Sequence, residues 1–594
     1  MMDIISNRLN QIRNWMKSNK YDAFIIPHAD EYMSEYLPPQ NERLEWATGF
    51  NGSAGVAVIT QNNASIFVDG RYTVQVREQV SDKLFEINHL IENPYLKWIE
   101  SNIKLNSKIG YDSRLVTRNW LKNANKTLNN QFEFEAIKEN PIDINWKDRP
   151  FLETPQALLL KEKLTGQSSF DKRIEIGKIL KEQKFDGALI TALDSICWLL
   201  NIRGQDIPCN PVLLSHALIY ANGNVDLFID KNKIPNGFND HVGSGVNVFQ
   251  KNDLKSNLSN LKGIKIGYDM NLGNAWSVDI MENGSAKVIN FKDPCTLPKA
   301  CKNKIELQGM KDCHIQDGVA VSKFLAWVDK QVLSGNLLNE GELSDKLELF
   351  RTEGEMFMGI SFDTISGAGG NAAIVHYNHT NNKSPKKLEI NSIYLVDSGG
   401  QYLNGTTDVT RTISIGNLDE VTKKAFTLVL KGHIALGRAT FPKGTSGMQL
   451  DPLARQFLWE HGMDYDHGTG HGVGHYLNVH EGPHGIAKKG SPVPLEEGMV
   501  VSNEPGYYET GKFGIRCENL VFVKSVKTDG NLETLGFENL TLVPFDKNLL
   551  NLKLMSNTEI QWLNDYHQTI WDNISPFLSG DDLVWLKNQT SPIQ

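Results

Sequence analysis

Two stretches in the first half of the chain show the same order of hydrophobic and polar positions. Residues 12–26, IRNWMKSNKYDAFII, align at a constant offset with residues 176–190, IGKILKEQKFDGALI. Each predicts an amphipathic helix, a short polar turn and an apolar strand. An aromatic segment follows each copy, LEWATGF at 44–50 and ICWLLNIRG at 196–204. The pattern favours a duplicated α/β domain; the alternative is chance similarity between two helix–strand units.

A different pattern follows the second of these units. Residues 303–332 carry apolar positions at helical spacing and predict one long amphipathic helix or a pair. Strand-like segments follow at 391–415 and 498–524. Near the C-terminus the capping-box signature Ser556-x-x-Glu559 precedes an apolar stripe. We expect this last helix to serve in packing, and it is a candidate oligomer contact.

At 594 residues the chain is too long for a single hydrophobic core, and three or four domains are expected. Proline-bearing linkers near residues 141–155 and 294–298 are the predicted boundaries in the first half. We therefore divide the chain into residues 1–145, 146–300, 301–548 and 549–594: two α/β domains, a third domain that begins with the long helix, and a helical extension.

The overall charge and the cysteines limit the classes of function. The net charge of -9 provides no basic surface for nucleic acid. The start of the sequence lacks a signal-peptide pattern, and no apolar run reaches the length that spans a membrane. The six cysteines show no CxxC spacing, a pattern typical of reduced thiols. We expect a cytoplasmic protein that binds neither nucleic acid nor membrane.

Residues 466–484, DHGTGHGVGHYLNVHEGPH, concentrate five of the 15 histidines: His467, His471, His475, His480 and His484. The first three are spaced for a helix face, but the four intervening glycines would cost a helix about 3–4 kcal/mol relative to alanine. An extended chain also places these three histidines on one side. Its other side is then glycine, which lets a second backbone come close. We interpret the segment as an extended histidine ladder.

The end of this segment, HEGPH at 480–484, matches the H-E-x-x-H pattern of zinc peptidases. That pattern binds zinc only on a helix, where both histidines share a face. Gly482 and Pro483 inside the motif argue against a helix. We therefore expect Glu481 to have no catalytic role.

Two aspartates flank a predicted hairpin in residues 394–415. The pair Asn404-Gly405 is a strong turn signal, and a turn there places Asp397 and Asp408 on one face. In the plain register, however, Asp408 would face Gln401. A β-bulge at Gly399-Gly400 is therefore expected to bring the two carboxylates together.

Two glutamates flank a second predicted hairpin in residues 500–523. A turn centred on Gly511 places Glu504 directly opposite Glu518, inside an apolar strand. Facing carboxylates repel unless a cation or a proton lies between them. A salt bridge from Arg516 to Glu518 is the alternative to a metal ion at this position.

The four carboxylates and one ladder imidazole together make an oxygen-rich ligand set. Four negative ligands would neutralise two divalent ions. Oxygen ligands with a single histidine favour Mn, Mg, Co or Fe(II) over a structural zinc. Two such ions can share a water, lower its pKa and polarise a carbonyl.

Five motifs in this order, VDSGG, TTDVTRT, GTGHGVG, SNEPGYY and RCEN, resemble the pita-bread metallopeptidases of family M24. The segments AIVHY at 373–377, VDGRY at 68–72 and ICWLLNIRG resemble the three-domain cytosolic aminopeptidase P group of that family. The resemblance implies an α/β fold, in which two duplicated N-terminal domains precede a pita-bread catalytic domain.

The resemblance also implies roles for single residues. The metal ligands would be Asp397, Asp408, His471, Glu504 and Glu518, with Asp408 and Glu518 bridging the two ions. The substrate-binding residues would be Arg71, His376, His467 and His480. His475 and His484 match no family role, and we expect them to make local hydrogen bonds.

The implied activity is hydrolysis of the bond between an N-terminal residue and a following proline by a metal-bridging hydroxide. Glu504 would relay the proton to the leaving nitrogen, while His480 and His376 would steady the oxyanion or the peptide. The resemblance further implies two Mn²⁺ ions, peptide substrates with proline second, and a homodimer. The alternatives are a prolidase, a methionine aminopeptidase and a non-enzymatic peptide-binding protein on the same fold.

Overall fold

The computed structural model describes residues 2–151, 153–382 and 384–594, and the chain divides into two compact units. Unit 1 comprises Met1–Glu162 and Gln167–Thr296, and unit 2 comprises Lys163–Gly166 and Leu297–Gln594. Within the described ranges, no helix has both the length and the apolar character needed to cross a bilayer.

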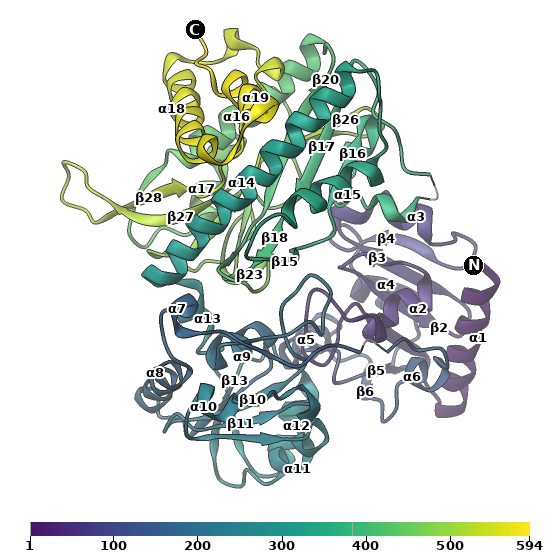
Figure 1. The fold of residues 1–594 in the computed structure, drawn as a ribbon. Coiled ribbons are helices and arrows are strands. Elements are labelled where there is room, and N and C mark those ends of the chain that lie inside the picture. The colour runs from purple at the N-terminus through teal and green to yellow at the C-terminus, as the bar shows by residue number, and fades with distance from the viewer. Residues whose placement is uncertain (1, 152, 383) are drawn as a thin grey trace. The chain divides into compact units, whose positions relative to one another are not determined.

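Unit 1 contains two six-stranded sheets with the same topology (Figure 1). The first sheet has the order β4-β3-β2-β1-β5-β6 and consists of β1 Ala23–Pro27, β2 Val56–Thr60, β3 Ala64–Val68, β4 Glu86–His89, β5 Lys108–Tyr111 and β6 Glu133–Ala136. The second has the order β12-β11-β10-β8-β13-β14 and consists of β8 Gly187–Ile190, β10 His216–Tyr220, β11 Val225–Phe228, β12 Val246–Phe249, β13 Lys265–Tyr268 and β14 Lys287–Asn290. In both, the first strand along the chain is antiparallel to the second and parallel to the fifth.

The predicted helix–turn–strand repeat is present in both sheets. Helix α1 (Met2–Asn19) precedes β1, and helix α8 (Ser169–Glu182) precedes β8. The aligned positions Ile12 and Ile176 are fully buried, as are Met16 and Leu180 one turn later. The apolar stripe of each copy thus packs its helix into the unit's core.

The turns between helix and strand repeat in detail as well. Lys20 and Lys184 both adopt a left-handed conformation, with φ of 61° and 59°. Asp22 and Asp186 each accept a 2.8 Å hydrogen bond from the backbone N–H that begins the fifth strand of their sheet. The duplication inferred from sequence is confirmed at the level of topology and local hydrogen bonds.

The remaining elements of unit 1 and of the linker are short. They are α2 Arg43–Thr48, α3 Gln75–Gln79, α4 Tyr95–Asn102, α5 Arg118–Thr127, α6 Pro141–Asn145, β7 Leu158–Leu159, α7 Glu162–Thr165, α9 Leu193–Leu200, β9 Ile202–Arg203, α10 Phe238–Val242, α11 Leu254–Ser259, α12 Ala275–Asn283 and α13 Thr296–Ala300. The exact division of the chain at residues 145, 300 and 548 stays a prediction.

Unit 2 surrounds its strands with long helices (Figure 1). The helices are α14 Lys304–Leu333, α15 Glu340–Arg351, α16 Glu420–Gly437, α17 Gly447–Trp459, α18 Asn557–Ile574 and α19 Gly580–Thr590. The strands are β15 Phe357–Ile360, β16 Ile365–Ala368, β17 Ser392–Ser398, β18 Gly400–Tyr402, β19 Gly405–Thr406, β20 Val409–Ile415, β21 Thr440–Pro442, β22 Gly470–Gly472, β23 Glu481–Ile486, β24 Val500–Asn503, β25 Gly506–Glu509, β26 Phe513–Arg516, β27 Asn519–Val526 and β28 Thr534–Asn539. They form sheets of order β15-β18-β19, β16-β17-β20, β21-β28-β27-β24-β22-β23 and β25-β26.

The two predicted C-terminal-half helices are present with their caps. The first is one continuous helix, α14, and Asn303 with Glu306 closes its N-terminus in a capping box. Ser556 and Glu559 do the same for α18. The apolar stripe of α18 contributes Leu563, Ile570 and Ile574, all fully buried. The extension therefore packs on α14 and α16, as expected for a packing helix.

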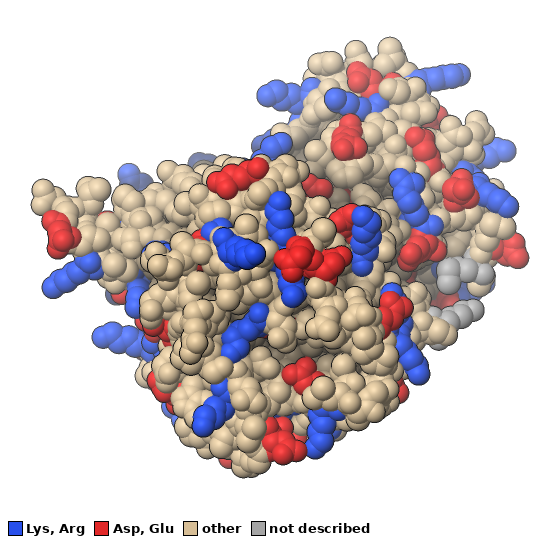
Figure 2. Space-filling model, turned by 90° about the horizontal axis from the view of Figure 1, so that it is seen from above, with Lys and Arg blue, Asp and Glu red and all other residues tan. Residues whose placement is uncertain are grey.

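Basic and acidic side chains are interspersed on the face seen in Figure 2. Over the described residues of that face, no broad field of one sign is visible, in keeping with the modest net charge of -9. A surface of this kind gives no strong long-range attraction for a polyanion.

Candidate metal centre

Asp397 and Asp408 lie on the arms of a hairpin, as predicted, but no bulge separates them. Asp397 pairs with Thr410 in the β17–β20 ladder, and the pairing beyond the turn continues in the same register. Asp408 lies two residues before Thr410, so that the carboxylates are diagonal neighbours on one face of the sheet. The predicted bulge at Gly399-Gly400 is wrong.

The reason is the position of the turn. Leu403 and Asn404 occupy it, and Gly405 already pairs with Tyr402. A side chain on Gly405 would overlap Cys313 of α14. The glycine thus allows helix and hairpin to pack closely, and it does not form the turn. The one-residue shift of the turn removes the need for a bulge.

Glu504 and Glu518 face each other as predicted. The β24–β27 ladder ends at the pair of Asn503 with Asn519, and the β25–β26 ladder resumes in the same register around Gly511. Between the ladders, the Glu504 N–H donates to the Thr469 carbonyl at 2.8 Å, and the Glu518 N–H donates to the Thr410 carbonyl at 3.3 Å. These two backbone hydrogen bonds thus fix each glutamate to a segment that is distant from it along the chain.

His471 comes from the short strand β22, which lies between β24 and β23. Its Nε2 lies 3.5 Å from an Asp408 oxygen and 3.5 Å from a Glu504 oxygen. Side chains at Gly470 and Gly472 would overlap the carbonyls of Ser502 and Glu481 on the neighbouring strands. These two glycines therefore let neighbouring backbones approach, as predicted. The extended ladder is confirmed only over Gly470–Gly472, because the chain turns afterwards: Tyr476 has a φ of 48°, and the Gly474 N–H donates to the Asn478 carbonyl at 2.9 Å.

These residues form a buried cluster of negative charge. Ligand atoms of Asp408, His471 and Glu518 all lie within 4.8 Å of one another. Burial, followed by the charges of Asp408 and Asp397, raises the pKa of Glu518 well above its usual value. Burial likewise raises the pKa of Asp408 to about 6, although its hydrogen bond to His471 opposes the rise. Burial lowers the pKa of His471, but Asp408 and Glu504 outweigh it and the pKa rises to about 9.

The cluster fits divalent cations. Oδ1 of Asp397 is buried, and no group in the described parts of the chain forms a hydrogen bond with it. A buried acceptor without a partner, beside three carboxylates whose charges repel, is stabilised by a bound cation. Four carboxylates and one imidazole are the donors that Mn²⁺, Mg²⁺ or Fe(II) accept. The residues present therefore suit the divalent metal ions that the sequence predicted.

Arg516 does not bind Glu518, so this alternative to a metal at Glu518 is wrong. Its guanidinium pairs with Asp397 at 2.6 Å and is 2% exposed. It also donates to the Thr410 hydroxyl at 3.1 Å and to the Tyr508 hydroxyl at 2.7 Å. Arg516 therefore orients the predicted ligand Asp397 and does not neutralise Glu518.

Two of the predicted substrate-binding histidines border the cluster. The His480 ring lies edge-on to that of His471, with centroids 4.3 Å apart. His467 forms a 2.8 Å hydrogen bond with the Tyr508 hydroxyl and approaches Glu504 to 3.9 Å. Both imidazoles are thus beside the carboxylates without being among the closest ligand atoms.

The other two predicted substrate-binding residues come from segments other than the strands that carry the cluster. His376 follows a short 3-10 segment, Gly369–Ala373, that packs on β26. Arg71 belongs to unit 1, where it pairs with Asp69 at 2.8 Å. Their contact with substrate stays a prediction.

The two histidines without an expected role are both buried. His484 bonds the Val500 carbonyl at 2.7 Å, and burial lowers its pKa to about 4. It is therefore a neutral, local hydrogen-bonding residue, as expected. His475 lies against α14, close to Gly309.

The HEGPH segment is not a helix. Strand β23 begins at Glu481, and its carboxylate is buried between the ammonium groups of Lys299 and Lys302. Burial raises the pKa of Glu481, but the two lysines outweigh it and lower the pKa to about 2. The zinc-peptidase interpretation is excluded, and Glu481 has a structural role that sequence inspection missed.

A second unpredicted network supports the histidine segment from α17. Arg455 pairs with Asp451 at 2.7 Å and donates to the His467 carbonyl at 2.9 Å. Asp451 accepts a 2.6 Å hydrogen bond from Thr469, whose carbonyl in turn holds Glu504. The i, i+4 spacing of Asp451 and Arg455 was the signal available in the sequence.

The comparisons with known proteins agree with this geometry. Residues 308–525 match metallopeptidase family M24, and residues 533–593 match the C-terminal region of peptidase M24. Residues 8–142 and 148–306 each match a creatinase/prolidase N-terminal domain. The four matches follow one another along the chain in the order expected from sequence.

Relatives that align with nearly the whole chain are named as aminopeptidases. A probable Xaa-Pro aminopeptidase P of Paracoccidioides brasiliensis (strain Pb03) is 39% identical, over 99% of both chains. One of Aspergillus fumigatus (strain CBS 144.89 / FGSC A1163 / CEA10) is 40% identical, over 99% of this chain and 93% of its own. The X-prolyl aminopeptidase of Caenorhabditis elegans, described as a cytosolic enzyme with a di-nuclear active site, superposes with a TM-score of 0.95. It is 33% identical over 99% of this chain and 100% of its own.

The fold, the carboxylate–histidine cluster and these relatives define a pita-bread metallopeptidase. The chain belongs to metallopeptidase family M24. Within it, the chain is a metallo-aminopeptidase in which two creatinase/prolidase N-terminal domains precede the catalytic domain.

Proposed function

We propose that this metallo-aminopeptidase removes the N-terminal residue of peptides whose second residue is proline. The observation that carries the proposal is the convergence of five side chains in one buried cluster: Asp397, Asp408, His471, Glu504 and Glu518. The names of the full-length relatives support the proline specificity. Such a bond requires its own enzyme because proline has no amide hydrogen and a fixed φ.

The five residues of the cluster would hold two divalent ions, and we propose Mn²⁺. As the family resemblance implies, Asp408 and Glu518 would contribute to both ions; one ligand atom of each lies within 4.8 Å of the other and of a His471 nitrogen. Asp397 and Glu504 would be further ligands to the ions. Asp397 is held by Arg516, and the Glu504 N–H is held by the Thr469 carbonyl. When bound, the pair supplies an activated water and polarises the scissile carbonyl.

The surrounding side chains would bind the peptide and move its proton. His480 would donate a hydrogen bond to the carbonyl oxygen as charge develops there, a role supported by its ring contact with His471. Glu504 would pass a proton to the leaving proline nitrogen. His467, oriented by Tyr508, would bind the peptide together with His376 and Arg71.

We further propose that the enzyme works in the cytoplasm as a homodimer. The description of the Caenorhabditis elegans enzyme as cytosolic supports the location, as do the scattered cysteines without CxxC spacing. Size-exclusion chromatography with light scattering tests the dimer.

The decisive test separates this activity from that of a prolidase. Chelated enzyme is supplied with Mn²⁺ and assayed on Arg-Pro-Pro-type peptides and on Xaa-Pro dipeptides. We expect turnover of the longer peptides with metal and none without it, and Glu518→Gln should be inactive on both. Turnover of dipeptides alone would identify a prolidase, and metal-independent turnover would contradict the proposed centre.

A further inference from the structure

Arg411 is a buried cation directly behind the carboxylate cluster. It follows Thr410 on β20, and successive residues of a strand point to opposite faces. Thr410 faces the cluster, where its hydroxyl donates to the Glu518 carboxylate at 2.7 Å. Arg411 therefore extends away from the cluster, into the protein, and it is 1% exposed.

The described hydrogen-bond partners of this guanidinium are all neutral oxygens. Two belong to the cluster's backbone: the carbonyls of Thr410 at 2.8 Å and Glu518 at 2.6 Å. The others are the carbonyls of Val543 at 2.6 Å and Pro544 at 3.1 Å, the side chain of Asn519 at 2.8 Å and the hydroxyl of Tyr566 at 3.0 Å. The guanidinium also lies over the Phe545 ring, 4.0 Å from its centroid.

A buried charge is costly unless all its donors are satisfied and an opposite charge lies near. The donors of Arg411 are satisfied by this cage of oxygens. Arg411 also holds the backbone carbonyl of Glu518 at 2.6 Å, so that the guanidinium and this carboxylate are attached to the same backbone. Arg411 therefore links the position of Glu518 to the integrity of the cage.

One wall of the cage comes from the C-terminal extension. Tyr566 of α18 accepts the hydrogen bond from Arg411, and its hydroxyl lies 2.9 Å from the Val543 carbonyl. The next residue, His567, accepts a hydrogen bond from the Phe545 N–H at 3.2 Å. Two successive side chains of α18 thus fix the loop that supplies the carbonyl oxygens of the cage.

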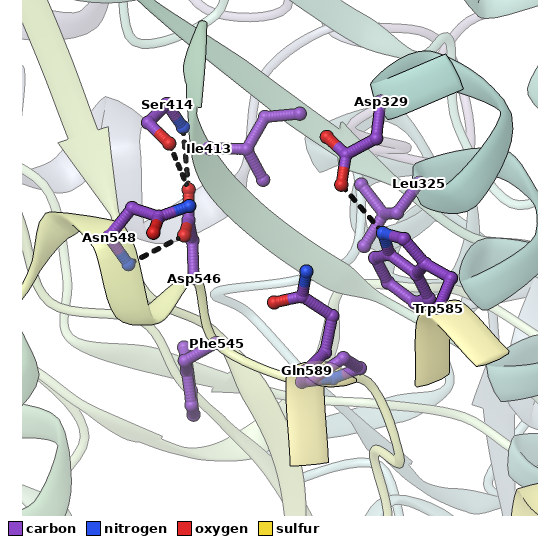
Figure 3. Close-up of a pocket in the computed structure, with 10 residues that line it drawn as sticks. Leu325, Asp329, Ile413, Ser414, Phe545, Asp546, Asn548, Trp585 and Gln589 are labelled. Atoms are coloured by element: carbon purple, nitrogen blue, oxygen red, sulfur yellow. Dashed lines mark hydrogen bonds between the residues drawn. The ribbon is translucent and has the colours of Figure 1, made fainter. Parts of the chain in front are cut away.

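The extension also docks on the catalytic domain at a second point. At this point lies a cavity of about 30 Å³, where Trp585 of α19 donates to Asp329 of α14 at 2.6 Å. Figure 3 shows the residues that line it. Asp546 accepts from Ser414 on another wall of the cavity. This contact holds α19 in place but shares no hydrogen bond with Arg411.

We propose that Arg411 is a positioning residue for the metal centre and that the C-terminal extension is part of that centre's support through Tyr566. Removing the Tyr566 hydroxyl takes away the oxygen that joins Arg411 to the Val543 and Thr541 carbonyls, and so loosens the loop and the backbone that carries Glu518. Residues one step away from metal ligands commonly change metal affinity 10- to 100-fold when replaced. The inference rests on the proposed function in one respect, the role of Glu518 as a ligand.

The test measures Mn²⁺ binding to full-length protein by competition with a chelating dye. Tyr566→Phe should weaken Mn²⁺ binding about tenfold, and Arg411→Lys, which keeps the charge but loses the planar fork, by about a hundredfold. Saturating Mn²⁺ should restore most of kcat to Tyr566→Phe, because no group that contacts substrate has changed. A purely structural defect would not be rescued by metal.

Trp585→Phe is the matched control, since it removes a hydrogen bond of the extension in which Arg411 takes no part. We expect a lower Tm with Mn²⁺ affinity within about twofold of the original. Equal weakening in Trp585→Phe and Tyr566→Phe, or unchanged affinity in Tyr566→Phe, would overturn the inference. Glu518→Gln separates the two proposals: if it binds Mn²⁺ normally, the ligand assignment itself fails. If Glu518→Gln alone loses metal, only the role of the extension fails.

Discussion

Single residues in this centre are held by donors that do not compete for the metal. Arg516 binds one oxygen of Asp397, and Thr410 binds one oxygen of Glu518. Each carboxylate keeps its remaining lone pairs for a cation, because a carboxylate oxygen accepts more than one bond. Such partners fix the orientation of a ligand, as is usual around metal sites.

Replacing either shared carboxylate should remove metal and activity together. Asp408→Asn or Glu518→Gln takes one negative charge and one bridging ligand from the cluster. It also removes one of the carboxylates that repel one another in the cluster, so that the fold should be retained. Metal analysis, circular dichroism and kcat on the purified variants test this. A variant depleted of metal but close to full activity would contradict the ligand set.

His480 and His471 should behave differently although their rings touch. We expect His480→Ala to keep both ions and to lose about a hundredfold in kcat, the effect of removing one oxyanion donor. His471→Ala should lose metal and activity together, because its Nε2 faces Asp408 and Glu504. The metal content and kinetics of both variants decide. A metal-free His480→Ala beside a metal-replete His471→Ala would mean that the wrong histidine was assigned.

The residue types of the centre could be predicted from sequence, but their partners could not. Asp397 and Glu518 lie in sequence segments that predict apolar strands, where an unpaired charge is costly, and this marked them as functional. Nothing local indicates that Lys299 meets Glu481, which lies 182 residues away. The same holds for Arg411, which donates to Tyr566, a residue 155 positions later in the chain. Long-range pairing is visible only in the fold.

At the scale of elements, strand register was predictable where one turn determined it. The ladders on both sides of Glu504 follow the register set by the turn at Gly511. The other hairpin was predicted one residue out of place, because Gly405 is required by its packing against α14 rather than by a turn. The sequence alone does not show that a glycine is required by its packing against a helix that is distant along the chain.

Strand β23 should depend on the buried ion cluster at its start. The folded state favours ionised Glu481, since its pKa is lowered to about 2. The stabilisation is therefore complete above the ordinary pKa of about 4.5 and is lost as pH falls towards 2. Glu481→Gln should lower the free energy of unfolding by about 3–5 kcal/mol at pH 7, because two buried lysines lose their partner. The difference should shrink between pH 4.5 and pH 3.

Urea unfolding at pH 7, 4 and 3 measures this effect. Glu533→Gln is the control, since its ion pair with Lys443 is largely exposed and should contribute at most about 1 kcal/mol. At pH 7 the folded fraction of Glu481→Gln should keep far more activity than Glu504→Gln. A pH-independent difference would show that the charge of Glu481 is not what stabilises β23.

On the scale of the whole molecule, the duplication in unit 1 was predictable because it repeats local signals. The helix, the turn and the first strand recur at a constant offset, and the two sheets have the same order. The pita-bread half contains no such repeat in its sequence. Its sheets join strands from distant segments, and only the resemblance of the five motifs to a known family indicated the fold.

Metal should stabilise one of the two units and not the other. All five proposed ligands belong to unit 2, and none belongs to unit 1. A ligand that binds only the native state adds about 2.7 kcal/mol per site at a hundred times its Kd. In calorimetry of the metal-free enzyme we expect two transitions, and Mn²⁺ should raise the temperature of only one by several degrees. Glu518→Gln should show both transitions with no shift. If Mn²⁺ raises the temperatures of both transitions together, the units unfold as one cooperative structure. The prediction that they unfold separately is then wrong.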